Sequence, residues 1–344
     1  MNYRPFGRTG IKVSPYCLGA MMFGAIGNPD HEECTRIIHK ALDAGINFID
    51  TADAYNKGES EEIVGKAVKG RRDSVVIGTK VNRPMGNDPN QQGSSRRWIM
   101  RAVEDSLRRL QTDYIDLYQL HRPTPDTDIE EALSALTDLV RAGKIRIFGT
   151  STFPASDIVG AQWVAERRGL LPVRAEQQPY SILNRSIERE VLPVSERFGM
   201  GVSVWSPLAK GLLTGKYRKG RNQPDTLRAK YFPKMMSDER SLDVIEQLIP
   251  AAESVGLSLT HMAIAFVLAH PLITSAIIGP RTMEQFDDLL AGAGVKLDDA
   301  TLDRIDEIVP PAVDIAPLET SAYIPPAIKE VALRRRPVSE RSAA

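Results

Sequence analysis

Four side chains that could hold or transfer protons follow short apolar segments of the sequence. Asp50 ends the segment INFID, Tyr55 follows it in TADAY, Lys80 follows VVIGT and His121 follows YIDLYQL. A tyrosine phenol has an ordinary pKa near ~10, so it is protonated and weakly acidic at neutral pH. A nearby lysine ammonium would stabilise the phenolate and lower that pKa, and Asp50 would hold the ammonium in an ion pair.

Together the four side chains could protonate a carbonyl oxygen while its carbon accepts a hydride. His121 would donate a hydrogen bond to that oxygen, and Tyr55 would supply the proton. No side chain supplies hydride, so this chemistry requires a nicotinamide cofactor. Each residue alone also has a simpler interpretation: Asp50 as a helix cap or turn residue, Lys80 as an exposed loop residue, His121 at the edge of the core and Tyr55 in packing.

The elements that would bring these residues together are short apolar strands alternating with helical segments. The strands show no clean polar alternation, which is typical of strands buried on both faces. Eight such repeats predict a (β/α)8 TIM barrel, in which the carboxyl ends of all strands meet on one face. A doubly wound sheet is the structural alternative, but no Gly-x-Gly-x-x-Gly turn follows an early strand. The predicted strands are Cys17–Gly19, Ile46–Asp50, Val75–Thr79, Tyr114–Leu120, Ile145–Gly149, Val173–Gln177, Val202–Trp205 and Ala276–Gly279.

Helical periodicity appears between these strands, for example in Cys34, Ile37, Ile38, Ala41 and Leu42. The opening Tyr3–Val13 is predicted to form a hairpin before the barrel, and Lys210–Pro233 is a basic, turn-rich excursion after the seventh strand. We expect one barrel domain over residues 1–310, and a proline-rich, partly disordered tail that wraps the surface over 311–344.

Composition is that of a soluble globular protein, with 344 residues, 42% hydrophobic. Lys plus Arg and Asp plus Glu both number 44, so net charge gives no reason to expect nucleic acid or a membrane as a partner. Cys17 and Cys34 are expected to be buried and reduced, and the histidines lack metal-ligand spacing. The beginning of the chain has no apolar signal segment, which predicts a cytoplasmic location. The oligomeric state is left open.

The sequence resembles the aldo-keto reductases, and specifically the bacterial branch that also contains relatives of potassium-channel β-subunits. The resemblance runs in order from about residue 3 to about residue 309. It is carried by FGRTGIKVSPYCLGAMMFG, GINFIDTADAYNKGESEEIVGKAV, VVIGTK, DYIDLYQLHRP, GKIRIFGTST, EQQPYSILNR, VSVWSPLAKGLLTGKY and IIGPRTMEQFDDLL.

This resemblance implies a catalytic tetrad of Asp50, Tyr55, Lys80 and His121, with Tyr55 as the proton donor, and NADPH as cofactor. Ser151 and Gln177 would bind the nicotinamide carboxamide, and Trp205 would stack on the nicotinamide ring. Arg281, just before a helix, would bind the 2′-phosphate. The full set of implied cofactor residues is Ala20, Met21, Asp50, Ser151, Gln177, Trp205, Ser206, Pro207, Leu208, Gly211, Lys216, Gly279, Arg281, Gln285 and Asp288, with Arg218 as further basic support.

Three positions depart from the family pattern. Thr152 and Leu289 stand where Asn is common, and Glu176 stands where Asn is common before Gln177. The first concerns the carboxamide contact, and Leu289 concerns adenine recognition. The substrate, a small-molecule carbonyl compound, would contact Met21, Met22, Tyr55, Val81, His121, Arg122 and Phe153. Arg122 would either contact a polar or anionic substrate or form a salt bridge at the rim.

Overall fold

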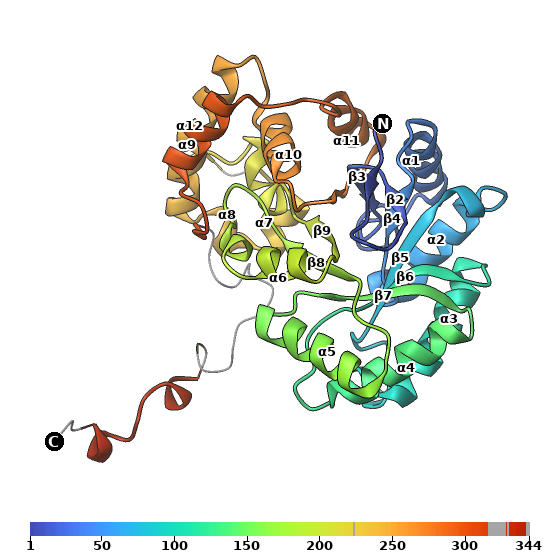
Figure 1. Cartoon of the computed structure of the whole chain (residues 1–344). Helices are drawn as coiled ribbons and strands as arrows, with labels where there is room; N and C mark the ends of the chain where they lie inside the picture. The colour runs from blue at the N-terminus through green and yellow to red at the C-terminus, as the bar shows by residue number, and fades with distance from the viewer. Residues whose placement is uncertain (223, 316–327, 329, 342–344) are drawn as a thin grey trace.

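A closed barrel of eight parallel strands forms the body of the protein (Figure 1). The computed structural model describes residues 1–222, 224–315, 328 and 330–341. All eight predicted barrel strands are present, which confirms the (β/α)8 barrel. In barrel order the strands are β10 (Ser275–Ile278), β3 (Tyr16–Gly19), β4 (Phe48–Asp50), β5 (Val76–Val81), β6 (Ile115–Leu120), β7 (Ile145–Ser151), β8 (Ala175–Pro179) and β9 (Gly201–Trp205).

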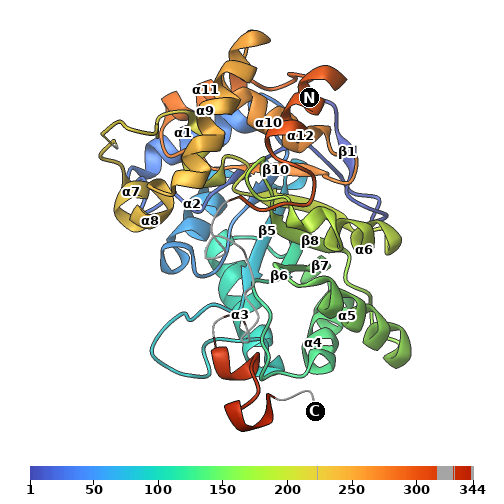
Figure 2. The ribbon, with the colours of Figure 1, turned by 90° about the vertical axis from the view of Figure 1, so that its left-hand side faces the viewer.

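Helices surround the strands, as Figures 1 and 2 show from two sides. The predicted apolar face of α1 is buried at Cys34, Ile37, Ile38 and Ala41, and Asp30 caps its first turn by accepting two backbone N–H groups. Both cysteines are free and buried. The helices are α1 (His31–Asp43), α2 (Glu59–Ala67), α3 (Arg96–Leu110), α4 (Ile129–Arg141), α5 (Ala155–Arg168), α6 (Val191–Arg197), α9 (Glu239–Ser254), α10 (Leu259–Ala269), α11 (Met283–Ala291) and α12 (Asp299–Ile308).

The predicted N-terminal hairpin closes the amino end of the barrel. Strands β1 (Arg4–Pro5) and β2 (Lys12–Val13) pair antiparallel, and between them Phe6 enters the apolar cluster of the barrel interior. Phe6 packs edge to face on Phe48, with ring centres 5.6 Å apart. A Cβ on Gly201 would lie 2.6 Å from the Phe6 ring, so glycine is needed there for this contact. Apolar side chains therefore fill this end.

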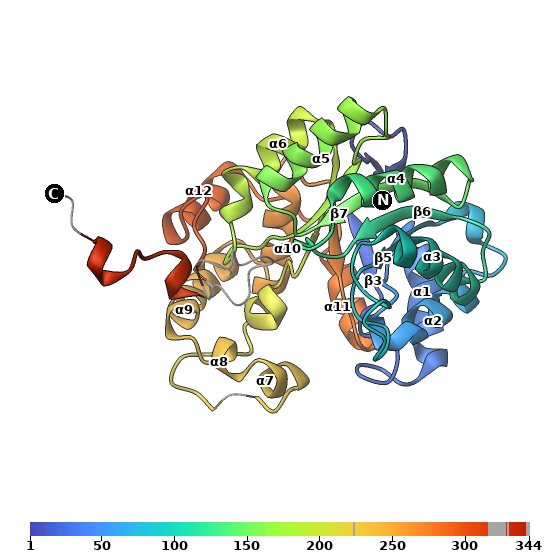
Figure 3. The same ribbon diagram turned by 90° about the horizontal axis from the view of Figure 1, so that it is seen from below.

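The excursion after β9 contains helical turns and reaches the segment after β3. It includes η4 (Ala209–Thr214), α7 (Leu227–Tyr231) and α8 (Pro233–Met236), and Figures 2 and 3 show α7 and α8 at the margin of the molecule. The Arg228 Nη2 atom lies 3.8 Å from the Met22 sulfur. Segments from opposite parts of the sequence thus meet across the carboxyl end of the barrel.

The chain after α12 first stays on the barrel. The Asp314 carboxylate accepts the backbone N–H groups of Arg185 and Ser186, at 2.7 and 2.9 Å. Residues 330–341 are exposed, and their turns η6 (Val331–Leu333) and η7 (Val338–Glu340) lie apart from the barrel in Figures 1 and 3. The rest of the predicted tail lies outside the described residues, and the domain boundary at residue 310 stays a prediction.

Among the residues that the structure describes, no single helix is long and apolar enough to cross a bilayer. Helices α9 and α10 together meet the length and composition requirement, but they are bent by 89° at the break between them.

Candidate active site

Lys80 lies at the centre of the polar cluster at the carboxyl end of the barrel. Its ammonium donates to both Asp50 carboxylate oxygens, at 2.8 and 2.7 Å, and to the Thr51 carbonyl at 2.8 Å. The Tyr55 hydroxyl lies 3.3 Å from the same ammonium. The Lys80 side chain is fully buried, so its charge is compensated by Asp50 rather than by water.

His121 completes the group from the neighbouring unit of the barrel. It directly follows β6, and its ring packs edge to face against the Tyr55 ring at 5.7 Å. Tyr55 starts the short turn η1 (Tyr55–Gly58) after β4, and Lys80 lies inside β5. Three consecutive barrel units therefore bring a phenol, an ammonium, a carboxylate and an imidazole to one place, as the strand-end argument predicted.

The pKa of Tyr55 differs from the sequence-based expectation. Burial raises the pKa of the phenol, the Lys80 ammonium opposes that effect, and the net direction is upward. Lys80 thus acts in the expected direction, but in the free protein loss of hydration outweighs it and the net pKa is raised. Burial lowers the pKa of Lys80, but the adjacent Asp50 and Tyr55 outweigh it and raise the pKa overall. At neutral pH the site therefore holds a protonated phenol beside a charged ammonium.

Burial holds the pKa of His121 well below its ordinary value, and the charges of Lys80, Arg122 and Arg83 add to this effect. His121 is only 6% exposed, and its Nδ1 atom has no hydrogen-bond partner among the described residues. The imidazole is thus neutral near pH 7 and can donate one ring N–H to an oxygen.

Ser151 and Gln177 lie beside the four-residue cluster, at paired positions of β7 and β8. Gln177 donates to Asp50 Oδ1 at 2.7 Å. The Ser151 hydroxyl is buried without a partner in the part of the chain that the structure describes. A buried hydroxyl without a partner costs free energy, so it fits a ligand group that would complete its hydrogen bonding, such as an amide.

Two of the three departures have a structural setting. Thr152 has φ 63°, an uncommon conformation for a β-branched residue and one that Asn adopts more readily. Its hydroxyl donates to the Ser151 carbonyl at 2.6 Å. Glu176 is fully buried and accepts from Thr150 and Gln178, and burial raises its pKa to about 8. Glu176 is therefore mostly protonated at neutral pH.

The loop after β9 presents an unusual backbone and several cations. Ser206, Ala209 and Lys210 have φ 56°, 47° and 55°, and Gly211 has φ 105°. Turn backbone that includes left-handed residues can orient successive N–H groups into a concavity that suits an anion. Lys216 is exposed at its surface, but partial loss of hydration by neighbouring groups, together with the charges of Arg281 and Arg228, lowers its pKa. Arg218 instead makes a bidentate pair with Glu246, at 2.7 and 2.6 Å, so its assignment as cofactor support is not favoured.

The implied adenosine-binding residues lie between β10 and α11 and along α11 itself. The Gln285 side chain accepts the backbone N–H of Arg281 at 2.9 Å, and Thr282 caps the helix. Asp288 lies 3.4 Å from His261. Leu289 is 6% exposed and packs into the core, so its side chain is not available to an adenine ring. Gly279 has open space where a Cβ would project.

The predicted substrate residues differ in how accessible they are. Met21 is 41% exposed and Met22 8% exposed, whereas Val81 and Phe153 are buried at 0% and 4%. Arg122 is half-buried, and its guanidinium lies 6.0 Å from the centre of the Trp205 ring. Ala20 is buried, and its N–H donates to the Asp50 carbonyl at 2.8 Å.

Sequence reasoning missed residues that support the site. Gln119 bridges two strands, lying 3.4 Å from Gln177 and donating to the Thr150 carbonyl at 3.2 Å. Gln119 is a polar residue two positions before His121, near the carboxyl end of β6, and was a usable signal. Asp53 is fully buried, and neither carboxyl oxygen has a hydrogen-bond partner among the described residues.

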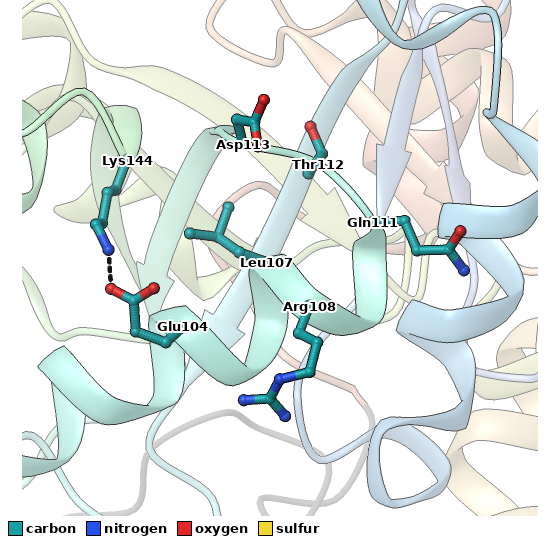
Figure 4. A pocket seen from close by; sticks show the side chains of 7 residues that line it. All are labelled: Glu104, Leu107, Arg108, Gln111, Thr112, Asp113 and Lys144. Atoms are coloured by element: carbon teal, nitrogen blue, oxygen red, sulfur yellow. Dashed lines mark hydrogen bonds and ion pairs between the residues drawn. The ribbon is translucent and has the colours of Figure 1, made fainter.

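A separate hollow lies at the opposite end of the barrel. Figure 4 shows it between the end of α3 and the residue preceding β7, with Lys144 pointing to Glu104. It has a volume of about 550 Å³ but carries none of the predicted site residues, so it is not the candidate site. Within the described residues no group of three or more His, Cys, Asp or Glu side chains is placed to hold a metal ion.

The protein is a parallel eight-stranded barrel, and Asp50, Tyr55, Lys80 and His121 cluster at the carboxyl end of its strands. The sequence pattern of the aldo/keto reductase family matches residues 15–310, and the chain belongs to that family.

Among individual relatives, the chain is 41% identical to a Bacillus subtilis protein named uncharacterized oxidoreductase YrpG, over 90% of this chain and 96% of the relative. It is 34% identical to the aldo-keto reductase YhdN of the same organism, over 96% and 100% of the two chains. It is also 35% identical to a probable voltage-gated potassium channel subunit beta of Oryza sativa subsp. japonica, over 90% and 97%.

Proposed function

We propose that this protein reduces an aldehyde or ketone to an alcohol, with NADPH as the reductant. The observation that carries the proposal is the position of the Tyr55 hydroxyl, 3.3 Å from a fully buried ammonium and beside a neutral imidazole. A reduced nicotinamide, when bound, supplies the hydride that no side chain can supply.

The residues of the chain provide the proton and the site for the oxygen. His121 donates a hydrogen bond to the carbonyl oxygen and orients it toward Tyr55. Tyr55 transfers its phenolic proton to that oxygen as negative charge develops there. Lys80 stabilises the phenolate that remains, and Asp50 keeps Lys80 charged and in place. Trp205, at the end of β9, supplies a flat face for the nicotinamide, and Ser151 supplies for its carboxamide a hydroxyl that has no partner among the described residues.

The test of this role is Tyr55→Phe, which removes the proton and keeps the ring. We expect kcat/KM for 4-nitrobenzaldehyde, followed by NADPH absorbance, to fall by about 10²–10⁴-fold. NADPH binding and thermal stability should stay close to wild type. Tyr3→Phe is the matched control, because Tyr3 is 49% exposed and far from the cluster in the hairpin segment. Full activity of Tyr55→Phe would show that another group donates the proton.

The preference for NADPH over NADH rests on Arg281, which precedes α11 and makes no ion pair with a carboxylate of the described residues. An arginine at this position can bind a 2′-phosphate through two hydrogen bonds. We expect Arg281→Gln to weaken NADPH binding by about 10–100-fold and to leave NADH binding nearly unchanged. Arg304→Gln, on the surface of α12 beside Glu307, is the control. An unchanged ratio of the two affinities would remove this reason for preferring NADPH.

A second candidate is a cofactor-binding regulatory subunit with little turnover. It is favoured by the similarity to proteins named as potassium channel β subunits. The two functions separate in one measurement, because a regulatory subunit would bind NADPH yet fail to oxidise it with any member of a panel of aldehydes and ketones. A cytoplasmic location remains a prediction.

A further inference from the structure

Cationic side chains gather around the mouth of the site without carboxylates to neutralise them. Burial lowers the pKa of Arg122, Lys210 and Lys216, and repulsion from neighbouring cations adds to it. Arg83 acts on Arg122, Arg228 and Arg122 act on Lys210, and Arg281 and Arg228 act on Lys216. Within the described part of the chain, none of these groups forms an ion pair with a carboxylate. Among the described residues, the acidic groups whose charge acts on Arg122 are the Tyr55 phenol and Glu176, and both are mostly protonated at neutral pH.

The cofactor accounts for only part of this charge. Lys216, Arg281, Lys210 and Arg228 lie on the loop after β9, on α7 and before α11, where the phosphates of a dinucleotide are expected. Arg83 and Arg122 instead follow β5 and β6, on the side of the barrel that carries Lys80 and His121. These two arginines are therefore left for a different anion.

Arg122 is positioned toward the reacting groups. Its guanidinium faces the Trp205 ring at 6.0 Å. Burial raises the pKa of the Tyr55 phenol, and the charge of Arg122 is among the groups that oppose this effect. One Nη1 donor is used by the His121 carbonyl at 2.7 Å, which fixes the side chain close to the backbone. A guanidinium has five N–H donors, so most of them are left for a ligand.

The two loops that carry these arginines are tied together by hydrogen bonds. Asn82, which precedes Arg83 and has φ 133°, donates to Thr124 Oγ1 at 2.6 Å and to Ser94 Oγ at 3.2 Å. The Ser94 and Thr124 hydroxyls lie 2.8 Å apart. Thr124 follows Arg122 by two residues, so this cluster holds both arginine-bearing loops at a fixed spacing. Such bracing favours recognition of a ligand group with defined geometry.

We propose that Arg83 and Arg122 form a subsite for an oxyanion of the substrate, which is therefore an aldehyde or ketone carrying a carboxylate or phosphate. The proposal rests on the proposed function, and it places the anion on the β5 and β6 side while the carbonyl oxygen meets Tyr55 and His121. Arginine recognises both oxyanions through paired hydrogen bonds.

The test compares substrates that differ in charge but little in shape. One pair is 4-formylbenzoate and its methyl ester, and the other is 4-formylphenyl phosphate and 4-methoxybenzaldehyde. We expect wild-type kcat/KM to favour the anionic member of at least one pair by about 10-fold or more, and the preferred pair identifies the oxyanion. Arg122→Gln should reduce this preference by about 10-fold or more, Arg83→Gln by less because Arg83 is exposed, and Arg122→Lys should fall between wild type and Arg122→Gln.

Arg197→Gln is the matched control. Arg197 ends α6 at the opposite end of the barrel, is exposed, and its loss changes the net charge by the same amount. Equal wild-type kcat/KM for both members of each pair, or the same preference in Arg122→Gln, would overturn the anion subsite while leaving the reductase proposal intact.

A binding measurement separates failure of the subsite from failure of the reaction. Calorimetry with 4-(hydroxymethyl)benzoate and its methyl ester, in the presence of NADPH, does not depend on turnover, because an alcohol cannot accept a hydride from the reduced cofactor. Selective binding of the carboxylate that is lost in Arg122→Gln would support the subsite even if no aldehyde were reduced. Equal binding of both compounds would contradict it.

Discussion

The two ends of the barrel are built from opposite kinds of side chain. At the amino end, Phe6, Phe48, Cys17 and Leu117 form an apolar cluster under the hairpin. At the carboxyl end, β4 and β5 carry a buried ion pair, β7 ends in a serine whose hydroxyl has no partner among the described residues, and the loop after β9 has residues in left-handed conformations. Apolar packing therefore lies at the amino end of the strands and the candidate active site at the carboxyl end. We expect substitutions at the first end to change mainly stability and substitutions at the second to change mainly activity.

Lys80 provides the strictest test of this separation, because it belongs to the candidate active site at the carboxyl end and its side chain is fully buried. Lys80→Met leaves the Asp50 charge buried without its cation, so we expect the free energy of unfolding to fall by about 3–5 kcal/mol, together with loss of turnover. The double variant Asp50→Asn with Lys80→Met should recover most of the stability but none of the activity. Urea titration and NADPH oxidation measure the two effects. Equal stability of the single and double variants would show that the ion pair is not what Lys80 contributes to stability.

Phe6→Ala examines the amino end. Phe6 is 2% exposed and packs on Phe48, so its truncation should lower the free energy of unfolding by about 3–5 kcal/mol. The value of kcat/KM should stay near wild type at temperatures where the variant is folded. Tyr3→Ala is the control, because an exposed aromatic in the same segment should change stability by only about 0.5 kcal/mol. A large loss of kcat/KM in folded Phe6→Ala would break the separation of the two ends.

The buried carboxyl group of Asp53, at the carboxyl end of the barrel, should make stability depend on pH. Burial and the charge of Glu61, opposed by Arg109 and Lys80, raise the pKa of Asp53 to about 8 from an ordinary 3.8. Tyr118, whose buried hydroxyl also has no partner among the described residues, lies close enough for Asp53 to raise its pKa. Between about pH 4 and pH 8 the folded protein keeps the Asp53 proton, whereas the unfolded chain loses it. Titration of Asp53 therefore lowers the free energy of unfolding as the pH rises through this range.

Asp53→Asn removes that titration while keeping the shape of the protonated side chain. We expect the free energy of unfolding of the variant, relative to that of wild type, to be higher at pH 8 than at pH 5. Urea titration at both pH values measures it. Glu176→Gln should change in the same direction, because burial also raises the pKa of Glu176 to about 8. A difference that is the same at both pH values would mean that Asp53 titrates normally.

Much of the fold could be predicted because its signals are local. Apolar segments of strand length alternate with helical periodicity, and a parallel barrel places the ends of such strands on one face whatever the loops contain. That argument brought Asp50, Lys80 and His121 together from residues up to 71 positions apart in the printed sequence. The hairpin followed from Gly7 and Gly10 between two extended pieces, which the pairing of Arg4 with Val13 confirms.

The sequence by itself determined the barrel, its strand order and the polar residues at the strand ends, because these depend on periodicity and on where an apolar run stops. Only the tertiary structure decided which charges are neutralised. It pairs Arg218 with Glu246, leaves Arg122 without a carboxylate among the described residues, and raises rather than lowers the pKa of Tyr55. The physical reason is that hydration and charge pairing depend on distances of a few ångströms between segments remote in sequence, and no local pattern encodes those distances.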